Sequence, residues 1–255
     1  MKNGIREILY LHLQTSERFV LSYGMTFREF TYSLNQPLQN ILLLKAQFEE
    51  AEFNRNTLLE FVPREYVAKL VKEGVYGTGD FCWIDFDEEM GLDELDGPEI
   101  AELLYLGHCK NHLHIPFYRK LNNQFVYLAH DDGWFNKVYY RSIDSFYRII
   151  SNLFPLKLEL LKLDRTWLGM KKKNEYTQVP GDVLLMLSRL MEEGAVFSFA
   201  GIQQNRSRLE IPIWVVGDFL NMDDMLEVFD DAKKQPPAAK LIYQRKSKEW
   251  SVIIQ

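Results

Sequence analysis

The alternation of hydrophobic and polar positions predicts several β-strands in the first third of the chain. Apolar residues alternate with polar ones over 8–13 and 26–34, which is typical of half-buried strands. The segment 41–53 fits either a helical or a strand period, although a hairpin with the preceding strand is plausible. The run at 81–86 (FCWIDF) combines aromatic and β-branched residues and therefore predicts a buried strand.

Helical signals occur at three places in the N-terminal two thirds. Pro63 suits a first helical turn and Gly74 suits a helix end, so a short helix is predicted between them. A second helix is predicted from about Pro98. A third covers 143–152 and should end before Pro155, with a strand over 156–163. Helical spacing predicts a core face on the second helix that comprises Ile100, Leu103, Leu104 and Gly107.

A three-stranded meander over about 116–141 is the clearest prediction from the pattern. Asn122-Asn123 and Asp131-Asp132-Gly133 suit tight turns, because these residues tolerate positive φ. This register assigns the side chains to two faces. The predicted core face holds Phe117, Leu121, Val126, Leu128, Val138 and Tyr140, with His130 and Trp134 at its tip. The opposite face holds Tyr118, Lys120, Phe125, Tyr127, Phe135, Lys137, Tyr139 and Arg141.

The C-terminal part shows a possible internal repeat. The pattern G-D-x-L-x-M starts at Gly181 and again at Gly217, and in each copy the aspartate could cap a helix that two strands follow. The chain is therefore predicted to be an α+β protein with a mixed or mainly antiparallel sheet. We expect an N-terminal domain over 1–163, a linker over 164–179 and a small α-β-β-α-β-β module over 180–255. The two domains could also pack as one body.

Composition narrows the class of protein. The 255 residues carry a formal charge of −6, which disfavours nucleic acid as the main partner, because phosphate binding requires a basic surface. No stretch approaches the roughly 20 apolar residues of a membrane span. Two cysteines form no disulfide framework, and the first 14 residues lack the features of a signal peptide. We therefore expect a cytoplasmic protein without a membrane segment.

Four of the five histidines lie in the stretch 107–141, and three of them define a candidate metal site. His108, His112 and His114, with Cys109 adjacent, offer the ligands that zinc prefers, although another divalent ion would also fit. One helical turn separates His108 from His112. The spacing does not match the HExxH motif, because Cys109 stands in the place of the glutamate. Histidines with a structural role are the alternative interpretation.

The HDDGW sequence at the meander tip is a second candidate site, formed by His130, Asp131, Asp132 and Trp134. Carboxylates beside an imidazole can act as acid and base, or bind a divalent ion. Turn formation alone also explains the Asp-Asp-Gly sequence. A third candidate is the acidic run that begins with Asp85 and continues through Asp87, Glu88 and Glu89. It starts where a buried strand ends, although its acidic residues also favour the N-terminus of the next helix.

The aromatic face of the meander is the remaining candidate. Tyr118, Tyr127 and Tyr139 stand among basic residues there, and such a surface can bind a partner or stack the bases of single-stranded nucleic acid. It could equally be covered by a helix.

The chain contains no GxSxG, no P-loop and no GxGxxG after a strand. The leading hypothesis is therefore a non-catalytic protein that binds a protein partner or a small ligand through the aromatic face or an adjacent cleft. A metal-dependent hydrolase that uses His108, His112, His130 and Asp131 is the alternative. Binding of single-stranded nucleic acid is a weaker alternative. The oligomeric state is not predicted.

Overall fold

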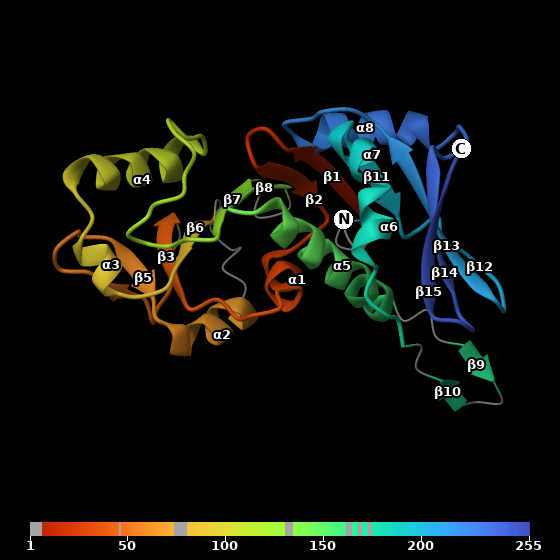
Figure 1. Ribbon diagram of the computed structural model, residues 1–255, viewed down its shortest axis with the longest axis horizontal. Helices are drawn as coiled ribbons and strands as arrows, with labels where there is room; N and C mark the ends of the chain where they lie inside the picture. The colour runs from red at the N-terminus through yellow and green to blue at the C-terminus, as the bar shows by residue number, and fades with distance from the viewer. Residues whose placement is uncertain are drawn as a thin grey trace.

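A computed structural model of the chain describes residues 7–45, 47–73, 81–130, 135–161, 165–167, 170–172 and 175–255. Its dominant feature is one antiparallel sheet of 13 strands with helices on both faces, which confirms the α+β class (Figure 1). The strands are β1 (Ile8–Gln14), β2 (Phe19–Tyr23), β3 (Asn40–Lys45), β4 (Glu52–Phe53), β5 (Glu60–Val62), β6 (Cys82–Phe86), β7 (Phe125–His130), β8 (Phe135–Tyr140), β11 (Ala195–Ser198), β12 (Gln203–Gln204), β13 (Arg208–Val215), β14 (Ala239–Gln244) and β15 (Glu249–Ile254).

The strand order is β15-β14-β13-β11-β1-β2-β8-β7-β6-β3-β5-β4, and β12 pairs with β13. One sheet thus runs through both predicted domains, because β11 pairs with β1. The predicted linker contributes a separate two-stranded antiparallel sheet of β9 (Arg165–Trp167) and β10 (Met170–Lys172). The described ranges contain no helix with the length and apolar run needed to cross a bilayer.

The helices divide between the two faces of the sheet, and each face carries its own hydrophobic core. One face packs against α1 (Phe27–Tyr32), α2 (Arg64–Glu73), α5 (Ile143–Leu160), α6 (Gly181–Leu185) and α7 (Ser188–Glu192). The other packs against α3 (Met90–Asp93), α4 (Gly97–Cys109) and α8 (Met222–Ala232), with α3 and α4 over one end of the sheet and α8 over the other (Figure 1). Covering a sheet on both sides buries most of its side chains.

Several predicted elements are confirmed, with boundaries shifted by a few residues. β1, β6 and α2 lie where the pattern placed them, and α4 begins beside Pro98. The helix α4 runs past Gly107 to Cys109 and ends at Lys110, whose φ of 50° is left-handed. Gly107 lies on the buried face, where an added Cβ would meet the Leu44 side chain at 2.8 Å. Leu104, predicted to be a core residue, is 54% exposed.

The strand predicted over 26–34 is wrong, because these residues begin a helix. Thr26 accepts the backbone N–H of Glu29 at 3.2 Å, and the Glu29 carboxylate accepts the backbone N–H of Thr26 at 2.8 Å. This reciprocal capping box satisfies two donors that would otherwise remain unpaired at the start of α1. The apolar residues at 27 and 30 then share one buried face of α1.

Pro155 does not end α5 as predicted, and no strand forms over 156–163 in the described residues. Proline has no N–H, so it cannot donate to the carbonyl of residue 151 four positions earlier. The backbone N–H of Val179 donates to that carbonyl at 3.1 Å instead, and the Ser151 hydroxyl donates to the Val179 carbonyl at 2.6 Å. The helix therefore continues through a proline because another segment supplies the missing donor.

The C-terminal part begins with two short helices, α6 and α7, which three strands, β11, β12 and β13, follow. The second group is α8, β14 and β15, so only this group has the predicted order of one helix and two strands. Whether the two groups reflect a duplication stays a prediction. The two aspartate caps are wrong: Pro180 stands at the N-cap of α6, and Asn221 caps α8. Asp218 lies four residues before the first residue of α8, so the two G-D-x-L-x-M sequences occupy different structural positions.

Gly194 supports a specific prediction about stability. Its φ is +81°, and an added Cβ would stand 1.9 Å from the carbonyl oxygen of Gly217. Gly194→Ala therefore combines a left-handed backbone with a steric clash, and we expect the free energy of unfolding to fall by about 2–4 kcal/mol. Gly97→Ala is the matched control, because nothing lies within 4 Å of its added Cβ. Chemical denaturation of both variants measures the difference. Equal stabilities would contradict the prediction.

Candidate functional site

A cleft of about 480 Å³ lies beside the sheet, between the first half of α5 and the segment that joins α1 to β3. This volume is within the range of small-molecule sites. Its base is formed where β6 ends and β7 begins. The described lining residues are Leu34, Asn35, Gln36, Pro37, Leu38, Gln39, Asp85, Asp87, Gln124, Phe125, Ser145, Arg148 and Ile149. The lining is mostly polar, and its described ionisable groups are two aspartates and one arginine.

Asp85 is the buried ionisable group of this cleft. It is the fourth residue of β6, and only 7% of its surface is exposed. The backbone pairing of β6 with β7 ends at Ile84. Beyond it the Asp85 side chain supplies the hydrogen-bond acceptor, because its Oδ1 accepts the backbone N–H of Phe125 at 2.6 Å and that of Gln124 at 3.0 Å. The carboxyl group therefore joins the end of one strand to the start of the next while it lines the cleft.

Burial raises the pKa of Asp85 to about 7, because an ionised carboxyl group loses its hydration in the protein interior. The backbone N–H groups of Phe125 and Gln124 oppose this shift, and the nearby charge of Asp87 adds to it. The group can therefore hold a cation when ionised and donate a hydrogen bond when protonated. Both states are accessible near neutral pH.

The entrance of the cleft carries exposed charges of both signs. Asp87 follows β6 and accepts a hydrogen bond from the Asn122 side chain. Its backbone carbonyl accepts the Asn40 side-chain amide at 2.8 Å, which fixes the turn after β6. Arg148 is exposed on α5. The described lining residues include one hydroxyl group, that of Ser145, and no histidine, cysteine, lysine or tyrosine.

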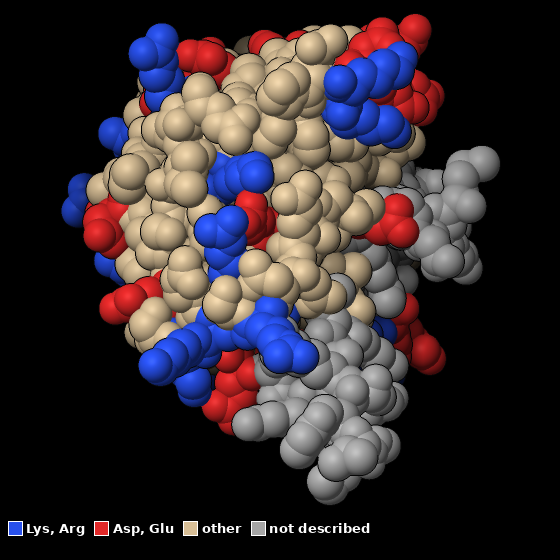
Figure 2. Space-filling view, turned by 90° about the vertical axis from the view of Figure 1, so that its right-hand side faces the viewer, with Lys and Arg blue, Asp and Glu red and all other residues tan. Residues whose placement is uncertain are grey.

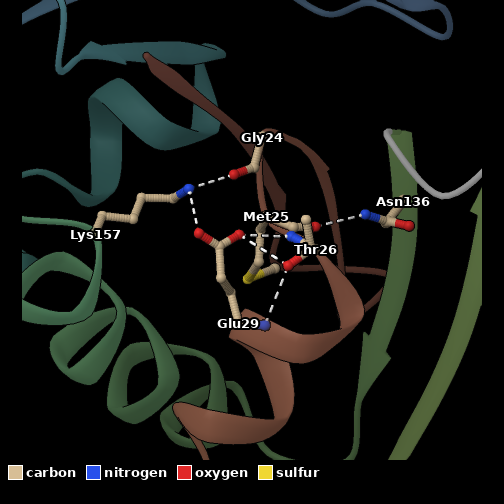
Figure 3. Close-up of polar contacts among 6 residues, drawn as sticks. All are labelled: Gly24, Met25, Thr26, Glu29, Asn136 and Lys157. Atoms are coloured by element: carbon tan, nitrogen blue, oxygen red, sulfur yellow. Dashed lines mark hydrogen bonds and ion pairs between the residues drawn. The ribbon is translucent and has the colours of Figure 1, made fainter. Parts of the chain in front are cut away.

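A second polar cluster lies deeper, between α5 and the turn that joins β2 to α1 (Figure 3). Lys157, 2% exposed, donates to the Glu29 carboxylate at 3.0 Å and to the Gly24 carbonyl. The Asn136 side chain donates to the Met25 carbonyl at 2.9 Å from β8. The cluster is enclosed in the core and connects a helix, a strand and a turn, so its evident role is structural.

The predicted histidine cluster does not converge in the described structure. His108 and His114 are exposed, and His114 Nδ1 lies 3.2 Å from the Glu102 carboxylate. His112 packs on the Tyr139 ring, with Nδ1 3.4 Å from the hydroxyl oxygen. Among the described residues, no group of three or more His, Cys, Asp or Glu is placed to hold a metal ion. Cys109 is exposed and free.

His130 lies at the end of β7, with its ring edge toward Phe135. His112 packs on Tyr139, which lies four residues along β8 from Phe135, about 13 Å at a strand rise of ~3.3 Å per residue. The two imidazoles therefore pack on different rings of β8, and the described residues place no group of three possible ligands around an ion. The other tip residues, Asp131, Asp132 and Trp134, lie outside the described residues.

The predicted meander has two described strands, and its proposed faces are wrong. Residues 111–124 form no strand: Asn122 has a φ of 50°, but buried Asn123 binds the Tyr118 N–H at 2.8 Å and so ties the loop together. His130 pairs with Phe135, one position beyond the predicted partner Trp134. This shift reverses the side assigned to every β8 residue. Val126 and Tyr139 consequently share one face.

Both faces of β7 and β8 are buried. Tyr127 and Tyr139 are 0% exposed, and Tyr127 stacks on Trp83 with ring centroids 5.3 Å apart. Tyr118 is half-buried in the loop before β7. The predicted aromatic platform therefore forms core, and its fully buried rings offer no surface for base stacking.

Sequence reasoning missed a contact between β1 and the segment that follows β13. Buried His12 places its Nδ1 2.8 Å from the carboxylate of Asp218. The Tyr10 hydroxyl donates to the Gly217 carbonyl at 2.9 Å and accepts the Phe219 N–H at 3.2 Å. The residues in each contact are more than 200 positions apart in the sequence, so no local sequence pattern predicts these contacts.

Charges at the β12–β15 end of the molecule occur in pairs, and uncharged residues cover much of the surface (Figure 2). Lys240 and Arg208 both contact Glu210, at 2.9 and 2.6 Å. Lys233 and Lys234 contact Asp230 and Asp231 in the same way.

A scan against protein-family models, a search of curated proteins and a search of solved structures each found no match.

Proposed function

We propose that this is a cytoplasmic, non-catalytic binding protein whose recognition site is the cleft lined by Asp85. The ligand we infer is a small polar molecule that carries an ammonium or guanidinium group. This group would sit against the carboxylate of Asp85, with Asp87 nearby. The observation that supports the proposal is a carboxyl group with 7% exposure in the wall of a cleft of about 480 Å³.

The chemistry of the lining favours this class of ligand. An ionised carboxylate shielded from water attracts a cation more strongly than an exposed one, because the effective dielectric constant is lower. The amide side chains of Asn35, Gln36 and Gln124 can accept and donate further hydrogen bonds. Arg148 is exposed at the entrance, so solvent screens its charge from a cation held at Asp85.

Calorimetric titration with putrescine and agmatine tests the proposal. Butane-1,4-diol is the matched neutral probe, because it has the length of putrescine without its charge. We expect both amines to bind and the diol not to bind. Affinity should rise with pH up to about 7 and then level off, because the cation binds the ionised form of Asp85.

The variant Asp85→Asn is expected to weaken amine binding by about 10- to 100-fold, the usual cost of losing a hydrogen bond to a charged group. It should also abolish the dependence of affinity on pH. Asp144→Asn is the control, since Asp144 is exposed on the same side of the sheet, near the start of α5, and is not a lining residue. Absence of amine binding, or equal binding by wild type and Asp85→Asn, would refute the proposed site.

A further inference from the structure

The two edges of the sheet differ in the protection they carry against pairing with another strand. One edge strand, β4, is two residues long and begins with Glu52. Short, charged edges resist association, because they offer few unpaired backbone groups. The other edge strand, β15, has six residues and pairs along its whole length with β14, from Gln244↔Glu249 to Ala239↔Ile254.

The strand β15 lacks the usual devices that block edge pairing. Its sequence, EWSVII, contains no proline, and its only charge is on the first residue. The register with β14 has no bulge. Ile253 and Ile254 are 49% and 57% exposed. An edge strand with exposed apolar residues and no bulge is a template for another strand.

The backbone groups that face outward can be assigned from one hydrogen bond. The N–H of Gln255 donates to the Ala238 carbonyl at 2.9 Å, across the ladder with β14. In an antiparallel ladder, alternate residues direct both backbone groups to the same side. Trp250, Val252 and Ile254 therefore direct their N–H and C=O groups away from β14.

No described strand pairs with this outward side of β15. The segment 175–179 approaches the start of the strand, where the Thr177 hydroxyl donates to the Lys248 carbonyl at 2.9 Å. The Trp250 indole donates to the Thr177 carbonyl at 2.9 Å. Both contacts lie at the beginning of β15, so the backbone from Val252 onward has no partner strand in the described chain.

We propose that β15 pairs with β15 of a second copy of this chain, antiparallel and about a twofold axis at Val252, so that the two sheets become one. This register places Trp250 opposite Ile254 and Ser251 opposite Ile253. Glu249 then lies opposite Gln255, so that no like charges meet. The exposed isoleucines become covered by the partner strand.

A second copy fits this edge because the strand is complementary to itself in that register. An antiparallel edge pair is an isologous contact, which closes at two chains. A contact dominated by one strand from each copy is small compared with the roughly 1,600 Å² of a stable interface. We therefore expect an association that depends on concentration, with a dissociation constant on the order of micromolar.

Sedimentation velocity over a dilution series tests this proposal. We expect the wild type to shift, as its concentration rises, from the chain mass of 30.1 kDa to twice that mass. Val252→Pro removes an outward N–H and leaves the ladder with β14 intact, so it should remain a monomer throughout. Val252→Thr keeps the N–H and the β-branched shape and should dimerise like the wild type.

Hydrogen exchange of the wild type keeps the proposal testable even if the proline variant does not fold. The amides of Trp250, Val252 and Ile254 should exchange quickly in dilute protein and slowly at high concentration. A wild type that is monomeric at every concentration would overturn the proposal. A dimer that a folded Val252→Pro variant retains would also overturn it, as would protection of these amides that does not depend on concentration.

Discussion

Replacing Lys157 with methionine is expected to lower the free energy of unfolding by about 3–5 kcal/mol, the typical cost of breaking a buried ion pair. The ammonium group of Lys157 donates to the Glu29 carboxylate and to the Gly24 carbonyl inside the core (Figure 3). Methionine fills a similar volume without a donor. The variant therefore leaves a buried carboxylate and a buried carbonyl without this partner.

The physical reason can be tested with the double variant Glu29→Gln/Lys157→Met. Glutamine keeps an oxygen that can accept the Thr26 N–H, so the capping of α1 survives while the buried charge is removed. We expect the double variant to be more stable than Lys157→Met alone. Lys246→Met is the matched control, since Lys246 is exposed. Urea denaturation of the wild type, both single variants Glu29→Gln and Lys157→Met, the double variant and the control measures the coupling, and strictly additive losses would contradict a coupled pair.

The second large effect concerns Asp85 and pH. Its pKa of about 7 in the folded protein lies above the ordinary value of 3.8, so the folded state holds an extra proton between these two pH values. The contribution of Asp85 to stability therefore falls as pH rises from about 4 to about 7, by about 4 kcal/mol for a shift of this size, and is constant above. This contribution is fully present below pH 4.

The variant Asp85→Asn isolates this contribution from the other titrating groups. The amide oxygen can still accept the N–H groups of Gln124 and Phe125, while the side chain no longer ionises. The stability of the variant relative to the wild type should therefore increase between pH 4 and 7. Asp144→Asn, at an exposed position, should show no such trend. A difference between Asp85→Asn and wild type that is independent of pH would contradict a raised pKa.

Local signals predicted the elements whose causes are local. Pro63 marks the start of α2, and the aromatic run at 81–86 became β6. The Thr26–Glu29 capping box was also present in the sequence, and its spacing would have indicated a helix in place of the predicted strand. Alternation of apolar residues alone was an insufficient guide there.

Other features depend on partners that are distant in sequence. The helix α5 passes through Pro155 because Val179 supplies a hydrogen bond to the carbonyl of residue 151. The two faces of the meander were misassigned because His130 pairs with Phe135, and a shift of one residue exchanges the sides of a strand. No pattern within either segment specifies these outcomes.

The sequence predicted part of the candidate site. Asp85 stood out as a carboxylate near the end of a buried strand, but the other walls of its cleft come from the segment after α1 and from α5. The histidines attracted attention through their spacing along the chain, but among the described residues they form no group of three that could hold a metal ion. Proximity in sequence was therefore a poor guide to proximity in space for this site.

The most direct test of the proposed binding site is an NMR titration of the Asp85 side-chain carboxyl carbon, with and without saturating putrescine. We predict a midpoint of about 7 in the free protein and a clear downward shift when the amine is bound, because a cation favours the ionised carboxylate. A midpoint near the ordinary value of 3.8, or one that putrescine leaves unchanged, would contradict a cation site at Asp85.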